Sequence, residues 1–192
     1  MTVRVLLDAT AIPRDRGCVG RYLEGIIGAS EGVDLLIACQ ARDAEILAAL
    51  APLATVIPLH RRFEATWRRL LWEQFSLPRL ASRVRADVIH SPHYTLPLAT
   101  RRPRVVTMHD ATFFSDPAVH SRIKAIFFRV WCRIAARRAS AVIAPSRATL
   151  DELARFVRIR GTAEVAPHGV DVTVFHPPTE VEIADFADRY GL

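Results

Sequence analysis

Short runs of consecutive apolar residues alternate along the chain with longer segments in which apolar residues recur at helical spacing. An apolar run without alternation is typical of a strand covered on both faces, and such strands form parallel sheets. We expect seven strands, at residues 3–8, 33–39, 54–59, 87–90, 104–108, 141–144 and 163–166. Because helical segments separate most of them, the pattern predicts an α/β fold with a Rossmann-like, open, mostly parallel sheet and helices on both faces.

Two helical segments stand out by their apolar arcs. Between residues 119 and 139 a broad apolar arc faces a strip of arginines, which predicts a well-buried helix. Between residues 63 and 75 one helical face collects Phe63, Trp67, Leu70, Leu71, Gln74 and Phe75. Trp72 falls on the opposite face beside Arg68 and Arg69, where an aromatic ring suits a lipid interface or an acceptor molecule. Packing of Trp72 under a neighbouring loop is an equally good interpretation.

The composition indicates a globular protein with an uneven positive charge. The 192 residues fit one α/β domain, 51% of them are hydrophobic, and the net charge is +6. Residues 60–85 hold seven arginines, and residues 118–138 hold six basic residues, including the only lysine, Lys124, and no acid. Such blocks attract phosphate groups. An arginine- and alanine-rich composition also follows from nucleotide bias, so we expect no nucleic-acid binding.

The cysteines and the termini suggest the compartment. Cys18, Cys39 and Cys132 share no short spacing, which indicates neither a disulfide framework nor a metal site. The first strand is interrupted by Asp8 and lacks the apolar core of a secretory signal. No apolar stretch approaches the roughly 18 residues that span a bilayer. We therefore expect a cytoplasmic protein, either soluble or peripheral on the inner face of the cell membrane.

A loop with two glycines, Gly17 and Gly20, follows the first strand and precedes a helical segment. Free amides in the first turn of a helix can bind a phosphate, but glycines at such a place also simply permit a tight turn. The standard dinucleotide motif requires a third glycine and an acid after the second strand, where this chain has Gln40. This argues against NAD, although Arg42 leaves open a phosphorylated ribose.

Polar residues follow the fourth and fifth strands. His93 and Tyr94 come after one strand, and His109 and Asp110 after the other. If the two strands are neighbours, these four side chains converge at the carboxyl edge of the sheet, where α/β proteins bind their ligands. The sequence alone leaves that adjacency open.

Prolines and a glycine between residues 167 and 178 predict a linker. Ile183, Phe186 and Tyr190 then have helical spacing, with Gly191 as the expected C-cap. We expect one domain over residues 1–176 and a linker with a helix over residues 177–192.

Six motifs together resemble the N-terminal domain of glycosyltransferase family 4, retaining nucleotide-sugar transferases with the GT-B fold. They are Gly17-Cys18-Val19-Gly20-Arg21-Tyr22, Leu71-Trp72-Glu73-Gln74 with Leu77-Pro78, Asp87-Val88-Ile89-His90-Ser91-Pro92, Val106-Thr107-Met108-His109-Asp110, Ala144-Pro145-Ser146, and Ala166-Pro167-His168-Gly169-Val170-Asp171 with Phe175 and Pro177. Two positions depart from the family pattern: Cys18 stands where a second glycine is usual, and His168 stands where Asn is common.

The resemblance implies a role for each candidate residue. His109 would be the catalytic residue that hydrogen-bonds the transferred sugar, and Gly17, Gly20 and Asp110 would bind the donor. The expected acceptor side consists of Arg21, His93 and Tyr94. The expected membrane or acceptor surface consists of Arg68, Arg69 and Trp72. The resemblance implies no metal and no permanent cofactor.

The expected function is the acceptor-binding half of a retaining glycosyltransferase. The donor would be a UDP- or GDP-sugar, and the acceptor a lipid-linked, polysaccharide or small molecule, with an anionic membrane as a further partner. The family's catalytic glutamates lie in a C-terminal nucleotide-sugar domain outside this sequence, so we expect the chain alone to be inactive. Alternatives are a non-catalytic binding module, a subunit of a split glycosyltransferase, and a sugar-nucleotide epimerase-like domain.

Overall fold

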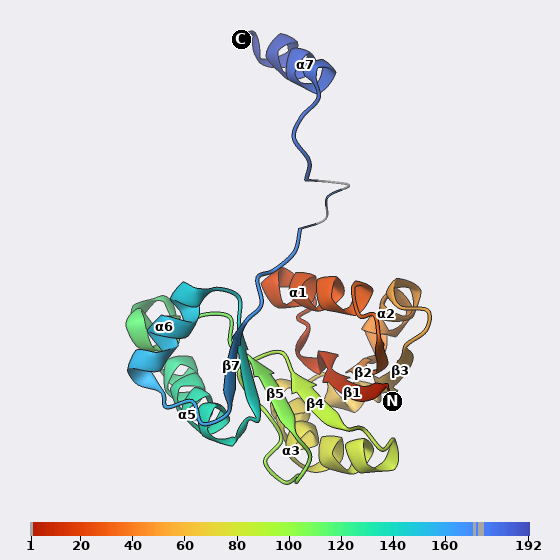
Figure 1. Cartoon of the computed structure of the whole chain (residues 1–192), viewed down its shortest axis with the longest axis vertical. Helices are drawn as coiled ribbons and strands as arrows, with labels where there is room; N and C mark the ends of the chain where they lie inside the picture. The colour runs from red at the N-terminus through yellow and green to blue at the C-terminus, as the bar shows by residue number, and fades with distance from the viewer. Residues whose placement is uncertain (1, 171, 173–174) are drawn as a thin grey trace.

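One open sheet of seven parallel strands forms the centre of the protein in a computed structural model, which describes residues 2–170, 172 and 175–192. The strand order is β3-β2-β1-β4-β5-β6-β7 (Figure 1). The strands are β1 (Val3–Asp8), β2 (Val33–Gln40), β3 (Thr55–Leu59), β4 (Val88–Ser91), β5 (Arg104–Thr107), β6 (Ala141–Ala144) and β7 (Thr162–Val165). Each neighbouring pair runs parallel, which confirms the predicted fold class.

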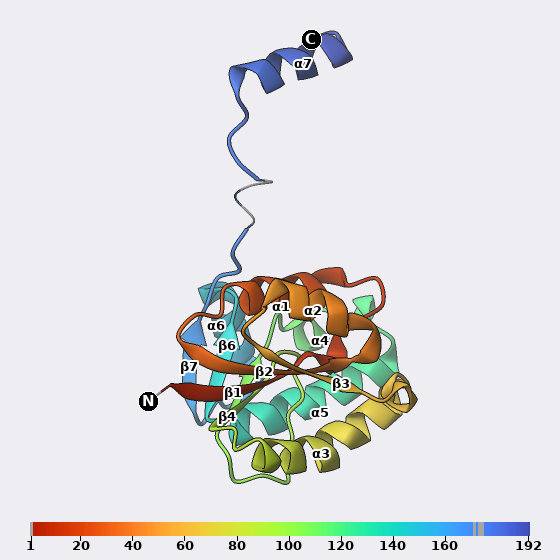
Figure 2. The ribbon, with the colours of Figure 1, turned by 90° about the vertical axis from the view of Figure 1, so that its right-hand side faces the viewer.

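Helices cover both faces of the sheet. On one face lie α1 (Gly17–Gly28) and α2 (Ala44–Leu50), and on the other lie α3 (Thr66–Arg83) and α5 (Arg122–Arg138), as Figure 2 shows. The remaining helices are α4 (Thr112–Ser115), α6 (Arg147–Phe156) and α7 (Glu180–Tyr190), with short 3-10 turns at Ala9–Ala11, Ala41–Asp43, Arg61–Phe63 and Pro117–Val119. Because α3 returns the chain from β3 to β4 beside β1, the winding reverses there, and such a reversal opens a crevice at the carboxyl edge.

The core consists of layers on either side of β1. Leu7 packs with the residues under α1 and α2, whereas its neighbour Leu6 packs with the residues under α3. Successive residues of a strand point to opposite faces, so an apolar run without alternation is the pattern of a strand buried on both sides. A third cluster lies under α5 and α6 and includes Val106, Cys132 and Leu153.

The orientation predicted for α3 is wrong. Trp72 is only 7% exposed and packs in the cluster that contains Leu6, whereas Trp67, Leu71 and Phe75 are between 49% and 59% exposed. The helix carries apolar residues on two faces, and the periodicity alone does not state which of them meets the sheet. Trp72 therefore packs inside the fold, as in the alternative interpretation, and is not part of a surface.

The helix α5 is also less buried than its pattern predicts. Ile123, Ile126 and Val130 are between 49% and 84% exposed. The residues that face the sheet are mostly small, namely Ala125, Cys132, Ala135 and Ala136. Small side chains let a helix approach a sheet closely, and Ile123, Ile126 and Val130 then lie outside the core, whereas Phe128 packs against it partly buried.

The last helix, α7, lies away from the sheet in both ribbon views (Figures 1 and 2). Thr179 and Glu182 form a capping box at its start, and Gly191 caps its end at a φ of +66°, which confirms the predicted C-cap. Asp171 of the last motif lies outside the described residues. The division into a domain over residues 1–176 and a linker with a helix over residues 177–192 stays a prediction.

Candidate functional site

The two histidine loops meet at the carboxyl edge of the sheet, because β4 and β5 are neighbours. The ring centroids of His93 and His109 lie 6.4 Å apart. Two further rings approach His109: Tyr22 from α1, at 4.9 Å in an edge-on arrangement, and His168 from the segment after β7, at 5.7 Å. Three other parts of the chain, namely the loop after β4, α1 and the segment after β7, therefore surround His109, and the predicted convergence of His93 and His109 is confirmed.

His109 is held as a neutral ring with a defined tautomer. Its Nε2 atom lies 2.7 Å from the carbonyl oxygen of Pro92. Burial lowers the pKa of His109, although the bond to Pro92 acts in the opposite direction. Because a carbonyl oxygen can only accept a hydrogen bond, Nε2 carries the proton. Nδ1 is then an acceptor that can bind a hydroxyl group.

Two other histidines of the site are neutral as well. Burial lowers the pKa of His93 to about 3, with further contributions from Arg69 and His109. Burial, assisted by His109, lowers the pKa of His90 to about 4. The ring of His90 lies 2.9 Å from the hydroxyl of Thr107. The imidazoles of His90, His93 and His109 at this edge of the sheet are therefore neutral at neutral pH.

Tyr94 supports Asp110 and does not line an open surface. Tyr94 is 3% exposed, its hydroxyl donates to Asp110 Oδ2 at 2.9 Å, and it accepts from the Asp110 amide at 3.2 Å. Burial opposes ionisation of Asp110, but hydrogen bonds from Thr112 and Tyr94 outweigh it and lower the pKa of Asp110. The prediction that the Tyr94 side chain contacts the acceptor is therefore wrong. This side chain instead positions the loop that carries His109.

A cleft of about 1020 Å³ opens between the N-terminal ends of α3 and α5 and the loops that follow β1 and β2. His93 lies in its wall and so joins the cleft to His109. The apolar part of the lining comes from Ile12, Val19, Leu70, Ile123, Phe127 and Phe128, and cations contribute as well, among them Lys124. A space of this size and mixed character can hold a small molecule or part of a larger one.

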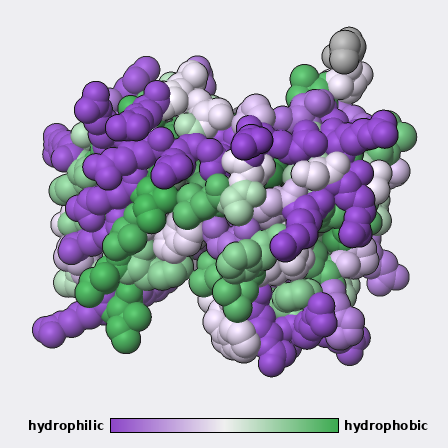
Figure 3. Space-filling view, turned by 90° about the horizontal axis from the view of Figure 1, so that it is seen from below, coloured by the Kyte–Doolittle hydropathy of each residue, from purple (hydrophilic) through white to green (hydrophobic). Residues whose placement is uncertain are grey.

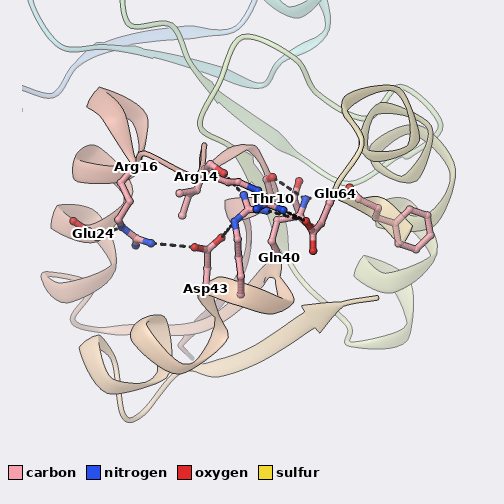
Figure 4. A network of polar contacts seen from close by, with 10 residues as sticks. Thr10, Arg14, Arg16, Glu24, Gln40, Asp43 and Glu64 are labelled. Carbon is pink, nitrogen blue, oxygen red and sulfur yellow. Dashed lines mark hydrogen bonds and ion pairs between the residues drawn. The ribbon is translucent and has the colours of Figure 1, made fainter. Parts of the chain in front are cut away.

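Ion pairs fix the loop that follows β1, as Figure 4 shows. Arg16 binds Glu24 of α1 and, at 3.0 Å, Asp43 after β2. Arg14 binds Glu64 at 2.7 Å. These contacts hold one wall of the cleft in place, and part of the charge of the loop is neutralised within the protein.

The two glycines of this loop are needed for its backbone conformation. The Gly17 amide donates to Asp15 and the Gly20 amide to Arg16, each at 2.7 Å, so neither amide is directed at a ligand. Gly17 has a φ of +44°, and a Cβ at Gly20 would lie 2.9 Å from the Cβ of Arg16. Within the described part of the chain, no backbone carbonyl accepts from the amides of Cys18 and Val19, in the first turn of α1.

The arginines predicted for binding surfaces lie in different environments. Arg21 is exposed on α1, 3.4 Å from Glu24, and does not line the cleft. Arg68 is exposed, with its guanidinium 5.0 Å from the ring centre of Trp67. Arg69 is 13% exposed in its side chain and binds the buried Glu73 at 3.4 Å. The predicted surface of Arg68, Arg69 and Trp72 is therefore divided: Arg68 is exposed, Arg69 lines the cleft, and only Trp72 packs inside the fold.

The sequence did not predict Tyr22 and His168 as neighbours of His109, or Glu73 as a buried carboxyl group. The rule that ligands bind at the carboxyl ends of strands would also have selected His168, since it follows β7. Burial and the charge of Asp8 raise the pKa of Glu73 to about 7. No signal in the sequence indicates that Asp8 and Glu73 lie close together, because the two residues are 65 positions apart in the chain.

The model of Glycosyltransferase Family 4 matches residues 28–174, which is most of the chain. The chain belongs to glycosyltransferase family 4. The family-4 match includes both histidine loops and the cleft residues of α3 and α5. No curated protein matches this family-4 chain.

Solved structures similar to the family-4 chain share its fold. HepE from Anabaena in complex with UDP has a TM-score of 0.62 and 18% identity, over 100% of this chain and 50% of that one. HepE in complex with UDP-glucose has a TM-score of 0.59 and 16% identity, over 97% of this chain and 49% of that one. Sucrose-phosphate synthase from Thermosynechococcus elongatus has a TM-score of 0.63 and 16% identity, over 99% of this chain and 53% of that one. The family-4 chain spans about half the length of each.

Two features are absent from the described residues. None of the helices there combines the length and the apolar composition that crossing a bilayer requires. Among the same residues, no three His, Cys, Asp or Glu side chains gather as a metal site would need.

Proposed function

We propose that the chain is the acceptor-side domain of a retaining glycosyltransferase that moves a sugar from a UDP- or GDP-linked donor to an acceptor in the cleft. The observation that carries this proposal is the junction at His93, where the cleft meets His109. The family assignment supports glycosyl transfer, and the bound UDP of HepE supports a nucleotide-sugar donor. The carboxyl edge of the sheet is the usual ligand site of such folds.

His109 would act as the residue that orients the transferred sugar. Its Nδ1 atom, free to accept because Nε2 donates to Pro92, would bind a sugar hydroxyl. In the proposed reaction the acceptor hydroxyl attacks the anomeric carbon on the face from which the diphosphate leaves, and its proton passes to the departing phosphate oxygen. Such a step depends on positioning and on charge stabilisation, and it requires no protein nucleophile.

A second domain would complete the site. We assign residues 1–176 to the acceptor side and expect residues 177–192 to lead toward a domain that binds the nucleotide sugar. Two observations support this: the chain spans about half the length of the similar structures, and α7 lies away from the sheet in Figure 1. Transfer would then require that domain, in the same chain or in a separate one.

The test is His109→Ala in the full-length gene product, with transfer measured from UDP-glucose and from GDP-mannose. We expect turnover to fall by about 100-fold or more, the range seen when a positioned hydrogen-bonding group is removed. His176→Ala is the matched control, because His176 is exposed in the segment before α7. Turnover of the His109 variant near that of the control would remove His109 from the site.

The half-length coverage also favours a second candidate, a subunit of a split glycosyltransferase or a non-catalytic binding module. Mixing the chain with a separately expressed nucleotide-sugar domain distinguishes the two. Transfer that is recovered only on mixing supports a split enzyme. Inactivity in every mixture supports a binding module.

A further inference from the structure

Six large apolar side chains are exposed on the two helices that flank the cleft. They are Trp67, Leu71 and Phe75 on α3, and Ile123, Ile126 and Val130 on α5, and we call them the apolar face. Figure 2 places both helices on the same side of the sheet. In Figure 3, which views the molecule from below, hydrophobic side chains gather in two groups with a notch between them.

The spacing of these residues makes two continuous stripes. Positions 67, 71 and 75 lie one helical turn apart, as do positions 123, 126 and 130. A single exposed apolar residue needs no explanation, but a row repeated over two turns on each of two helices is typical of an interaction surface.

Positive charge lies on the same two helices as the apolar face and in the turn before α3. The exposed cations of these segments include Arg61, Arg62, Arg68, Arg122, Lys124 and Arg133. Residues 118–138 contain no acid, and the two acids of residues 60–85 are occupied, since Glu64 binds Arg14 and Glu73 is buried. The described residues therefore offer these cations no unpaired carboxylate on either helix, and the face as a whole attracts anions.

We propose that the apolar face docks on a bilayer that contains anionic lipid. Apolar side chains would enter the boundary between headgroups and acyl chains, while the arginines and Lys124 would bind phosphates at the surface. Trp67 suits this boundary, because its ring is amphipathic and stacks near the guanidinium of Arg68, 5.0 Å away. A second copy of the chain fits less well, because a two-fold contact would set two cationic surfaces against each other.

Docking in this way would place the mouth of the cleft at the lipid surface. Ile123 belongs to the apolar face and also lines the cleft, together with its neighbour Lys124. An acceptor with an apolar tail could then enter from the bilayer and present its polar end to His93. This assignment of a lipid-linked acceptor rests on the proposed function, whereas the docking itself does not.

The experiment is flotation of the 192-residue chain with vesicles of phosphatidylcholine alone and of phosphatidylcholine with phosphatidylglycerol. It uses no sugar donor, so its result is independent of transfer activity. The charge variant is Arg68→Glu with Arg122→Glu, and its control is Arg155→Glu with Arg158→Glu, also exposed. The apolar variant is Trp67→Ser with Ile126→Ser, and its control is Ile46→Ser with Leu53→Ser, exposed elsewhere. Circular dichroism checks the fold of each.

The chain is expected to float with the anionic vesicles. The charge variant should partition at least about 25-fold less, from roughly fivefold for each of the two lost cations, and the apolar variant at least about tenfold less. Both controls should bind as the parent does. Absence of binding to anionic vesicles overturns the proposal, as does equal binding of all variants. A dimer in gel filtration that the apolar variant abolishes would assign the face to a second copy and also overturns it.

Discussion

Replacing Tyr94 by Phe removes one hydroxyl from a side chain that is 3% exposed. That hydroxyl donates to the carboxylate of Asp110 at 2.9 Å and accepts from the amide of Asp110 at 3.2 Å. A hydrogen bond to a charged group contributes about 1.5–3 kcal/mol and a neutral one about 1 kcal/mol, so the variant should lose about 3 kcal/mol of unfolding free energy. For a domain of this size the melting temperature should fall by about 6–12 °C.

Urea denaturation and calorimetry of the two proteins measure this difference. Tyr190→Phe is the control, because Tyr190 is exposed on α7, and it should leave stability unchanged. Hydrogen bonds lower the pKa of Asp110, so the stabilisation is present above the unfolded pKa near 3.8 and is lost as the pH falls through the folded value. The effect of Tyr94→Phe should therefore shrink in acid. A loss below about 0.5 kcal/mol at pH 7 would refute this reasoning.

Three further outcomes are expected. The pKa of Glu73 is raised by burial from 4.5 to about 7, so folding favours its protonated form; stability is full below pH 4.5 and is lost as the pH rises through about 7. Glu73→Gln should therefore gain about 2 kcal/mol relative to the parent between pH 5 and pH 8 in urea denaturation, and a gain independent of pH would contradict this. Gly161→Ala would place a Cβ within 2.6 Å of two backbone carbonyl oxygens and should lower the melting temperature by several degrees, whereas Gly169→Ala, with open space around it, should not. Trp72→Ala should cost about 3–5 kcal/mol as a core truncation and Trp67→Ala less than about 1 kcal/mol; equal losses would show that the orientation of α3 is wrong.

The strands could be predicted from the sequence because an apolar run without polar alternation indicates by itself a strand that is buried on both faces. Leu6 and Leu7 pack into different layers, and a strand that is covered on both sides allows no polar alternation. The meeting of His93 with His109 followed from the same logic, since polar residues after parallel strands end at one edge of the sheet.

Other features depend on contacts between separate parts of the chain, and the hydrophobic periodicity of the sequence does not report such contacts. Whether Trp67 or Trp72 faces the sheet is decided by the fit of α3 against β1 and β4, and both arcs of that helix are apolar. The bond from Tyr94 to Asp110 joins residues 16 positions apart in two loops. The contact of His168 with His109 requires the segment after β7 to run back toward Tyr22 of α1, which only the folded sheet determines.

Lys124 is the only lysine in the sequence, and it lines the cleft. Apart from a terminal amine, an amine-directed dye thus has one side-chain target, at the mouth of the cleft. A fluorophore attached there would report vesicles, nucleotide sugars or acceptors as changes in its emission, without the need to introduce a new reactive residue.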